Sequence, residues 1–445
     1  MTRENSKPII SKVKGKVGTK LYVESVLVDN KPAFIVKNLS TEKIEIKYTI
    51  EQDCCTLRPL TKGECGYIPY SYDRKILDEL ISSEITTEEA LDEILKQIDK
   101  FIDLPKREKI LILGDILLTY SLEWVSTLHY PFFVGDNESG KSSVLHLGRY
   151  LNYRCMMSED LPHANIYNFL GEDEEATGTI CEDEAQFLDK DGDKIRTYKS
   201  SYSSGSSKPR VVTLQSRKFQ VYYKTYCAKW FAGEKLPRDK GFMERLAIVN
   251  MVKGNPKSNI KRLKSREISQ LQKLRNMLLI WKIQRVGKNQ DSFKTDLTGR
   301  NQELWEDFLS VFQNTKFYGQ AENVVKHYVN QRHDSIKNSL EATIFKILIE
   351  NINEKKEIES KAFWIILTTD NIHLPGRLDT WSSRKFYPDE FDVTLSPNSL
   401  SNLLEDKFQG TKMSRVKTVD GKQRKTTVYC FDEKTIETLK TKYNI

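Results

Sequence analysis

Residues 129–151 form the stretch HYPFFVGDNESGKSSVLHLGRYL, and this stretch decides the fold. The apolar run at 132–134 is typical of a buried strand, and the run at 143–151 is typical of a helix. Between them, the segment 135–142 carries two glycines that permit a tight turn. A strand, a glycine-rich turn and a helix in this order predict one repeat of an α/β fold.

The segment 135–142, which we call the phosphate loop, matches the pattern G-x-x-x-x-G-K-[ST]. A chain of this length would contain the pattern by chance roughly once in a hundred cases. In such a loop the backbone N–H groups face phosphate oxygens, the lysine reaches the β- and γ-phosphates, and the serine hydroxyl binds Mg²⁺. The sequence therefore predicts a phosphate cradle for ATP and Mg²⁺ made by Gly135, Asp136, Asn137, Glu138, Ser139, Gly140, Lys141, Ser142 and Ser143.

A phosphate cradle of this kind needs a metal-holding carboxylate at the end of a neighbouring strand and a second acid for the attacking water. The stretch GTICEDEAQ at 178–186 offers both acids directly after a β-like run. We expect Asp183, together with Ser142, to hold Mg²⁺ and Glu184 to polarise the nucleophile. Glu182 occupies a position that is normally apolar and buried, so a shift of this assignment by one residue stays open.

Composition limits the class of protein. The chain has 445 residues, 30% charged and 38% hydrophobic, which predicts a folded protein of two to four domains. The net charge of +8 suits a polyanionic partner. Seven cysteines without a CxxC pair argue against a zinc site or a disulfide framework. We expect a cytoplasmic protein without a signal peptide or membrane helix.

The first 106 residues are expected to form a β-rich module plus a helix. Residues 18–48 contain two β-like runs joined by the turn at 29–32, which predicts a hairpin. Thr86 and Glu89 form a capping-box pattern before a helix that Pro105 ends. A second helix is expected from about Arg107 to Trp124.

An ATPase core is expected at 107–258, where strands alternate with helices in a mostly parallel sheet. Further β-like runs lie at 178–181, 226–232 and 245–252. The Ser/Gly-rich stretch at 199–210 is expected to be a mobile loop inside this core.

The remaining sequence is expected to form a helical lid at 259–355 and a winged-helix domain at 356–445. Helical periodicity is strongest near 262–284, 301–313 and 338–353. In the last domain a helix from Pro397 to Phe408, capped by Ser396, precedes a hairpin with a turn at 420–422. A basic hairpin beside a helix suits contacts to duplex DNA, or the domain serves subunit packing or a protein partner. The hairpin's basic residues are Lys412, Arg415, Lys417, Lys422, Arg424 and Lys425.

Four stretches taken together resemble a known family. They are PFFVGDNESGKSS, GTICEDEAQF, YCAKWFAGEKLPRDKGFMERLAIVNM and LTGRNQELWEDFL, within about 110–315. Their order is similar to the AAA+ ATPase domain of helicase-type proteins in phages, plasmids and archaeal mobile elements, relatives of the superfamily 3 and minichromosome maintenance helicases. The resemblance implies a ring, expected to be a homo-hexamer, that hydrolyses ATP with Mg²⁺.

The resemblance also implies roles for residues outside the phosphate loop. Arg245 would act as an arginine finger toward a neighbouring subunit, with Arg238 as the rival candidate, and Arg300 would sense nucleotide bound to its own subunit. Lys208 and Arg210 lie where related helicases place a hairpin that lines the central pore and holds single-stranded nucleic acid. Arg217 and Lys218 follow them, and stacking could come from Tyr198, Tyr202, Tyr222 and Tyr223.

One position departs from the family. Where the family places a small polar residue to position water, the run CAKWFAG continues into Glu234. This departure weakens the expectation of fast hydrolysis, and Glu234 is either a second acid or a solvated residue. The function we expect is a DNA helicase or translocase acting in replication of a mobile element. The alternatives are an ATP-dependent DNA-binding switch, such as an origin-recognition protein or helicase loader, and an ATPase that remodels proteins.

Overall fold

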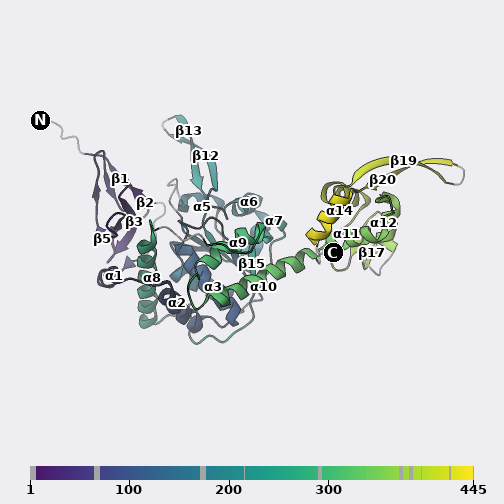
Figure 1. Cartoon of the computed structure of the whole chain (residues 1–445). Coiled ribbons are helices and arrows are strands. Elements are labelled where there is room, and N and C mark those ends of the chain that lie inside the picture. Colours follow the sequence, from purple (N-terminus) through teal and green to yellow (C-terminus); the bar gives the residue numbers. More distant parts are fainter. Residues whose placement is uncertain are drawn as a thin grey trace. The chain divides into compact units, whose positions relative to one another are not determined.

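The computed structural model describes residues 7–64, 71–170, 177–214, 216–288, 293–337, 339–369, 374–379, 384–391, 393–419, 422–443 and 445. The chain divides into two compact units, Met1–Lys326 (unit 1) and His327–Ile445 (unit 2) (Figure 1). Within the described ranges, no helix combines the length and the apolar character needed to cross a bilayer.

The N-terminal part of unit 1 is a β module. Its main sheet has the order β2 (Lys14–Val17), β3 (Leu21–Val28), β4 (Lys31–Asn38), β5 (Ile44–Lys47), and β8 (Ser71–Tyr72) pairs with β3. The predicted hairpin is confirmed as β3–β4, because Asp29 and Asn30 both take the positive φ angles that a tight hairpin turn requires. A smaller sheet joins β1 (Ile9–Ser11), β7 (Thr56–Arg58) and β6 (Ile50–Glu51).

Three helices connect this module to the central sheet: α1 (Arg74–Ile81), α2 (Thr87–Phe101) and α3 (Lys106–Tyr120). The predicted capping box at the start of α2 is confirmed. Helix α3 ends at Tyr120, four residues before the predicted end. It is buried along most of its length, because α2, α8 and α9 pack against it.

The centre of unit 1 is a sheet of five parallel strands, so the predicted α/β fold with a parallel sheet is confirmed. The strand order is β10 (Cys155–Ser158), β11 (Thr179–Glu182), β14 (Ala228–Gly233), β9 (Tyr130–Val134), β15 (Leu246–Asn250). Strand β10 was not predicted, because its sequence CMMS has no β-branched residue. The connections contain α4 (Lys141–Leu151), α5 (His163–Leu170), η1 (Ala185–Lys190), α6 (Gly192–Ser200) and α7 (Lys240–Met243).

A two-stranded hairpin is inserted between α6 and β14. Strands β12 (Ser207–Leu214) and β13 (Arg217–Lys224) pair along their whole length and project from the body of unit 1 (Figure 1). The prediction of a mobile loop at 199–210 is therefore wrong for residues 207–210, which begin β12. The Val, Thr and Tyr residues of both strands have high β propensity, although the segment before them is rich in serine.

Unit 1 continues with α8 (Ser265–Arg285) and α9 (Gly299–Ser310), and α10 (Tyr318–Lys337) runs across the boundary between the units. Helix α8 packs against α1, α2 and α4, and α9 packs against α3. The predicted helices near 262–284 and 301–313 are confirmed, whereas α10 was not predicted as a separate helix.

Unit 2 begins with α11 (Leu340–Asn351), β16 (Glu357–Glu359) and α12 (Ser360–Thr369), followed by the short pair β17 (Gly376–Leu378) and β18 (Phe386–Pro388). Next come α13 (Pro397–Asn402), the π-helical turn η2 (Leu403–Lys407), β19 (Thr411–Val419), β20 (Lys422–Cys430) and α14 (Glu433–Tyr443). The sheet order is β16–β20–β19. The Ser396 cap and the hairpin agree with the prediction, α14 was not predicted, and residues 420–421 of the turn lie outside the described residues.

Candidate functional site

The phosphate loop connects the end of β9 to the start of α4. Glu138 and Gly140 both have positive φ, 63° and 92°. A Cβ atom on Gly135 would lie 2.3 Å from the carbonyl oxygen of Met251, so only glycine fits where the loop passes the end of β15. The N–H groups of Ser143 and Val144 donate to the carbonyl oxygen of Gly140, and the N–H groups of the two residues before them have no acceptor within the helix. The loop is therefore a tight turn that leads directly into the N-terminus of α4, and a helix N-terminus stabilises anions.

Lys141 is buried and its ammonium group is held by the loop itself. Its Nζ donates to the carbonyl oxygens of Gly135 and Asp136, at 2.6 and 2.7 Å. The hydroxyl of Ser139 is buried and has no hydrogen-bond partner within the part of the chain that the structure describes. A cationic group and a hydroxyl without a partner suit an anionic ligand with several acceptor oxygens.

The two acids of the second motif follow the end of β11. Asp183 is buried and Glu184 is exposed, with a positive φ of 57° that turns the chain into η1. Strand β14 lies between β9 and β11, so the acids come from the strand next but one and not from the adjacent strand as predicted. They nevertheless reach the phosphate loop, because the carboxyl ends of parallel strands share one edge of the sheet.

Glu182 has a different environment from the two acids that follow it. Its carboxylate forms a buried ion pair with Lys194 and accepts a hydrogen bond from the Tyr198 hydroxyl at 2.6 Å. Burial raises the pKa of Glu182, against the opposing effect of Lys194 and Tyr198. Both partners belong to α6, and Glu182 does not line the cavity beside the phosphate loop. Of the three consecutive acids, only Asp183 and Glu184 line that cavity.

A cavity of about 610 Å³ joins these elements at the carboxyl edge of the sheet. Its walls are 137–143 of the phosphate loop and α4, the pair Asp183 and Glu184, the end of β14 at Gly233 and Glu234, and the segment 254–261. Ligands of open α/β sheets bind at this edge. Residues 137–143 of the predicted loop thus share one cavity with both predicted acids, whereas Gly135 and Asp136 do not line it.

Gln186 was not predicted and connects two sides of this cavity. Its Nε2 donates to the Glu184 carboxylate, and its Oε1 accepts from the backbone N–H of Glu234 at 3.2 Å. A Cβ on Gly233 would lie 2.7 Å from Gln186 Oε1, so the glycine allows the close approach. Glu234 itself is exposed at the cavity, immediately after β14. No pattern in the sequence pointed to this link, because it depends on where β14 ends.

Arg245 and Arg300 lie together at the opposite edge of the sheet. The carbonyl of Arg245 accepts from the N–H of Tyr130, the first residue of β9, about 13 Å along the strand from Val134. The two guanidinium carbons lie 4.6 and 4.5 Å from the ring centroid of Tyr202. Burial and the charge of Arg300 lower the pKa of Arg245.

Neither arginine lines the cavity of its own phosphate loop. The sequence expectation for Arg300 was contact with nucleotide of its own subunit, whereas the structure places Arg300 beside Arg245, where it pairs with Glu303 at 2.6 Å. The rival Arg238 lies in the loop after β14, and its N–H donates to the Asp189 carboxylate at 2.9 Å.

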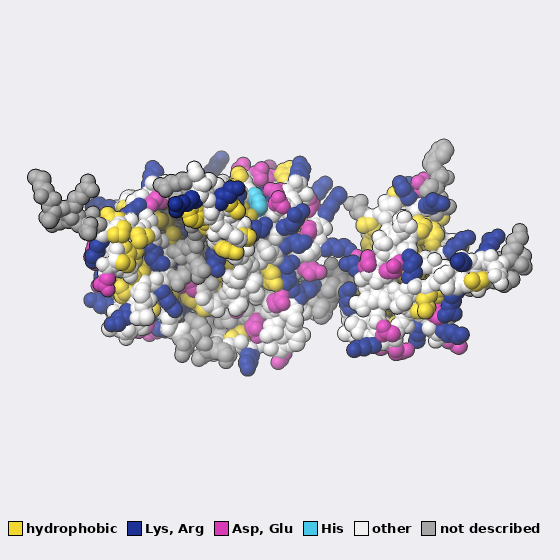
Figure 2. Space-filling model, turned by 90° about the horizontal axis from the view of Figure 1, so that it is seen from above, with side chains coloured by type: hydrophobic (Ala, Val, Ile, Leu, Met, Phe, Trp, Pro, Cys, Tyr) yellow, Lys and Arg dark blue, Asp and Glu magenta, His cyan; other side chains and the backbone are white. Residues whose placement is uncertain are grey.

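The β12–β13 hairpin carries basic and apolar side chains. Lys208 donates to the Thr197 hydroxyl at 2.5 Å, and the Arg210 guanidinium lies 4.7 Å from the Tyr167 ring centroid. Figure 2 looks down on the side from which the hairpin projects and shows Lys and Arg side chains next to hydrophobic ones. Exposed hydrophobic residues of the hairpin are Val211, Phe219 and Tyr222.

The four tyrosines considered for stacking differ in their exposure to solvent. Tyr222 is 58% exposed on the hairpin. Tyr198 is fully buried against Glu182, and the ring of Tyr202 is covered by Arg245 and Arg300. Tyr223 packs edge-on against Tyr167. The expectation of stacking is therefore wrong for Tyr198, because its ring is buried and its hydroxyl donates a hydrogen bond to the Glu182 carboxylate.

The hairpin of unit 2 also carries cations, and two of them have acidic partners. Lys412 pairs with Glu405 at 3.0 Å, and Arg415 pairs with Glu357. Arg424 and Lys425 are exposed on β20, and the side chain of Lys422 lies outside the described residues. Figure 2 shows Lys and Arg side chains along this hairpin.

The residues at the phosphate loop fit a magnesium ion bound together with phosphate oxygens. Mg²⁺ prefers oxygen ligands and takes one or two carboxylates plus substrate phosphates, which the Ser142 hydroxyl and the Asp183 carboxylate can supplement. Within the described ranges, no group of three or more His, Cys, Asp or Glu residues is placed to hold a metal ion.

No protein-family model matches the chain, and no curated protein matches it. Among solved structures, the C-terminal region of NrS-1 in its apo A form is 11% identical, with 92% of this chain and 96% of that chain covered and a TM-score of 0.35. A structure described as SCCmec type IV Cch, active helicase, is 12% identical, with 97% of both chains covered and a TM-score of 0.35. Similarities as low as these carry no inference about function.

Proposed function

We propose that the protein is an ATPase of the AAA+ helicase type that couples ATP hydrolysis to movement along DNA, as in the replication of a mobile element. The observation that carries this proposal is the single cavity shared by the phosphate loop, Asp183 and Glu184. A phosphate cradle alone would suit any nucleotide-binding protein. A cradle with two acids at the same sheet edge suits hydrolysis of the terminal phosphate.

Each residue of the cavity has a distinct task in this proposal. Lys141 exchanges its two loop carbonyls for phosphate oxygens and neutralises their charge. Ser142 and Asp183 hold Mg²⁺, which supplies charge stabilisation for the phosphates. Glu184, exposed at the cavity, orients the attacking water and accepts its proton. Gln186 holds the Glu184 carboxylate in a fixed relation to the end of β14.

The position of the two arginines supports assembly into a ring. Arg245 and Arg300 lie at the sheet edge away from their own phosphate loop, so within one chain they have no access to the nucleotide. In a head-to-tail ring, one edge of each subunit faces the opposite edge of the next. Both arginines would then complete the site of a neighbour, with Arg245 as the finger, and we propose a homo-hexamer.

Two hairpins provide contacts for DNA. On β12–β13, Lys208, Arg210 and the exposed Tyr222 suit a single strand, because cations neutralise phosphates and aromatic rings stack on bases. In unit 2, helix α13 followed by the β19–β20 hairpin supports the predicted winged helix. Its β19–β20 hairpin suits duplex phosphates through Lys412, Arg415, Lys422, Arg424 and Lys425.

A second candidate function is an ATP-dependent DNA-binding switch. Glu234 favours it, because a carboxylate stands at the cavity where the related motors place a small polar residue that positions water. The two functions differ in a strand-separation assay on a forked duplex with ATP. The motor separates the strands and loses this activity in Lys141→Ala, whereas the switch binds the fork and leaves it annealed.

A further inference from the structure

Tyr202 lies at the amino edge of the central sheet, where both Arg245 and Arg300 contact it. The two guanidinium carbons lie 4.6 and 4.5 Å from the centroid of its ring, and all three side chains are half-buried. The face of an aromatic ring attracts a cation, and more strongly where water is partly excluded. The ring therefore holds two guanidinium groups close together although their like charges repel each other.

The other contacts of the two arginines differ in strength. Arg300 forms an ion pair with Glu303 at 2.6 Å, whereas the Arg245 guanidinium donates to a neutral acceptor, the carbonyl oxygen of Gly241. Hydrogen bonds to a carboxylate are stronger than those to a neutral group. The Nε atoms of both arginines are buried and have no hydrogen-bond partner among the described residues. We therefore expect the orientation of Arg245 to depend on the ring more than that of Arg300 does.

The hydroxyl group of Tyr202 points toward Glu303, the partner of Arg300. Its oxygen lies 3.5 Å from the Glu303 carboxylate, at the outer limit for a hydrogen bond. The contact with Arg245 is made by the ring. Removing the hydroxyl should therefore leave the contact with Arg245 intact, whereas removing the ring should abolish it.

The backbone on both sides of Tyr202 is fixed to the segment 126–130, which leads into β9. The carbonyl oxygen of Tyr202 accepts from the N–H of Leu128 at 2.9 Å. Ser203 forms an antiparallel bridge with Thr127, and the N–H of the next residue donates to the carbonyl oxygen of residue 126 at 2.8 Å. The ring therefore projects from a backbone that is held in place.

The same segment also fixes the elements that carry the two arginines. The N–H of Tyr130 donates to the carbonyl oxygen of Arg245 at 2.8 Å. The N–H groups of residues 126 and 127 donate to the carboxylate of Asp307, at 2.7 and 3.0 Å. Asp307 belongs to α9, the helix that begins with Gly299 and Arg300. One segment thus sets the positions of the ring and of both arginines.

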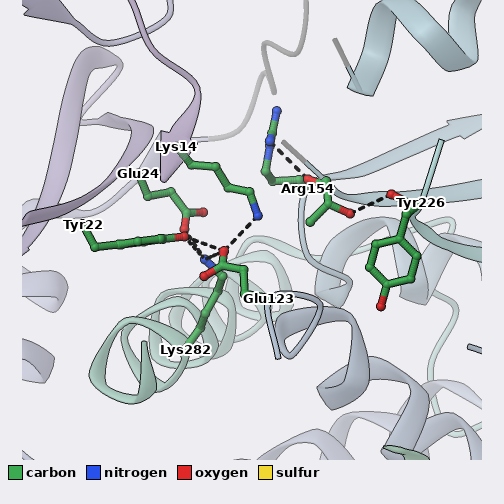
Figure 3. A network of polar contacts seen from close by, with 8 residues as sticks. Lys14, Tyr22, Glu24, Glu123, Arg154, Tyr226 and Lys282 are labelled. Carbon is green, nitrogen blue, oxygen red and sulfur yellow. Dashed lines mark hydrogen bonds and ion pairs between the residues drawn. The ribbon is translucent and has the colours of Figure 1, made fainter. Parts of the chain in front are cut away.

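The chain just before this segment is anchored in the interior of unit 1. Figure 3 shows the carboxylate of Glu123 between the ammonium groups of Lys14 and Lys282, each 2.8 Å away. The hydroxyl of Tyr226 donates to the carbonyl oxygen of Val125 at 3.0 Å. A side chain that orients a functional group needs such a rigid support.

We propose that Tyr202 is the positioning residue of the arginine finger. Its ring holds the Arg245 guanidinium, with that of Arg300 beside it, in the orientation that reaches the nucleotide of a neighbouring subunit. A group that is oriented before the nucleotide arrives loses less freedom when the reaction takes place. This inference rests on the proposed function, and it assigns the ring to the arginines and not to stacking on bases.

The first test measures steady-state ATP hydrolysis by the full-length protein without DNA, so that stacking on bases does not contribute. Tyr202→Leu should lower kcat about a hundredfold with KM within about twofold, because a small misplacement of a catalytic group costs about that much. Tyr202→Phe keeps the ring and should stay within about threefold of the wild type. Tyr318→Leu, at another half-buried tyrosine of unit 1, is the matched control and should be unchanged.

The second test mixes variant subunits and asks on which side of the shared site Tyr202 acts. Tyr202→Leu mixed with Lys141→Ala should recover activity, because the Lys141→Ala subunits supply an intact ring and arginine to a neighbour with an intact loop. Tyr202→Leu mixed with Arg245→Ala should not recover, because both subunits are defective on the arginine side. Tyr202→Met replaces Tyr202→Leu in both tests if the Tm shows that the leucine variant does not fold.

The outcomes distinguish this inference from the proposed function. Where Arg245→Ala is inactive but Tyr202→Leu keeps the wild-type kcat, the positioning role is refuted and the proposed function stands. Recovery in the mixture with Arg245→Ala, or a loss in Tyr202→Phe as large as in Tyr202→Leu, also refutes it. If the wild type does not hydrolyse ATP, or Arg245→Ala hydrolyses it at the wild-type rate, the proposed finger fails and the positioning role fails with it.

Discussion

Lys194 and Glu182 form an ion pair in the interior of unit 1, with 4% and 3% of their side chains exposed. Tyr198 donates to the same carboxylate, so Glu182 is held from α6 by two partners. Successive residues of a strand point to opposite faces, and the chain leaves β11 directly after Glu182. Glu182 is therefore a structural acid, whereas Asp183 and Glu184, which follow it, line the cavity at the phosphate loop.

Glu182→Gln is expected to lower the free energy of unfolding by about 3 kcal/mol, because it leaves the buried Lys194 ammonium with only the exposed Asp160, 3.6 Å away, as an acidic partner. Urea denaturation measures this change. The control is Glu184→Gln, two residues on and exposed, which should change stability by less than about 0.5 kcal/mol while abolishing most hydrolysis. Equal stability of the Glu182→Gln variant and the wild type would contradict a structural role for the pair.

Gln186→Ala is expected to reduce kcat for ATP about tenfold with little change in KM, because the Glu184 carboxylate loses the amide that holds it. Gly233→Ala should act in the same direction, since its Cβ would displace Gln186. Steady-state ATPase assays with both variants test this. A rise in KM at constant kcat would show instead that Gln186 serves nucleotide binding.

Arg245→Ala is expected to lower the ATPase rate about a thousandfold in rings of that variant alone. Mixing it with Lys141→Ala, which is inactive for a different reason, should restore activity. In equal random mixtures, about a quarter of the interfaces would pair an intact loop with an intact arginine. Absence of any recovery, in mixtures shown to exchange subunits, would contradict a site shared between neighbours. Arg238→Ala, mixed in the same way, serves as the control for the rival arginine.

His163 should report on the base of the β12–β13 hairpin. Its Nε2 lies 2.7 Å from both the Thr197 and the Tyr167 hydroxyls. Burial lowers the pKa of His163, and the charge of Lys208 lowers it further. Because the pKa in the folded state lies below the ordinary 6.5, the stability contributed by the neutral ring is present above pH 6.5 and lost as the pH falls through the folded pKa.

Lys208→Gln is therefore expected to raise the pKa of His163, because it removes the neighbouring charge. An NMR titration of the histidine ring signals measures the shift. The same titration of Arg217→Gln, a substitution at the far end of the hairpin, should leave the pKa unchanged. An unaltered pKa in Lys208→Gln would mean that the charge of Lys208 does not act on the ring.

The features that could be predicted from the sequence are those formed by residues that lie close together along the chain. The strand, loop and helix around Lys141 follow one another along the chain, so their residue types alone predict them. Asp183 and Glu184 were predicted because a β-like run precedes them. The intervening strand β14 could not be foreseen, since strand order is set by packing across the sheet.

The features that sequence analysis missed are contacts between distant segments. Gln186 acquires its role from the backbone of Glu234, 48 positions away. Arg300 and Arg245 are 55 positions apart in the sequence, yet both guanidinium groups lie against the ring of Tyr202. The sequence CMMS of β10 has no strand pattern and low β propensity. It forms a strand because its backbone pairs with β11.

The most direct test of the account is the rate of Mg²⁺-dependent ATP hydrolysis with and without single-stranded DNA, for the wild type and Lys141→Ala. We expect DNA to stimulate hydrolysis by the wild type, and the Lys141→Ala variant to show neither basal nor stimulated turnover. Hydrolysis that is indifferent to DNA, or tight ATP binding with negligible turnover, would contradict a motor that moves along DNA.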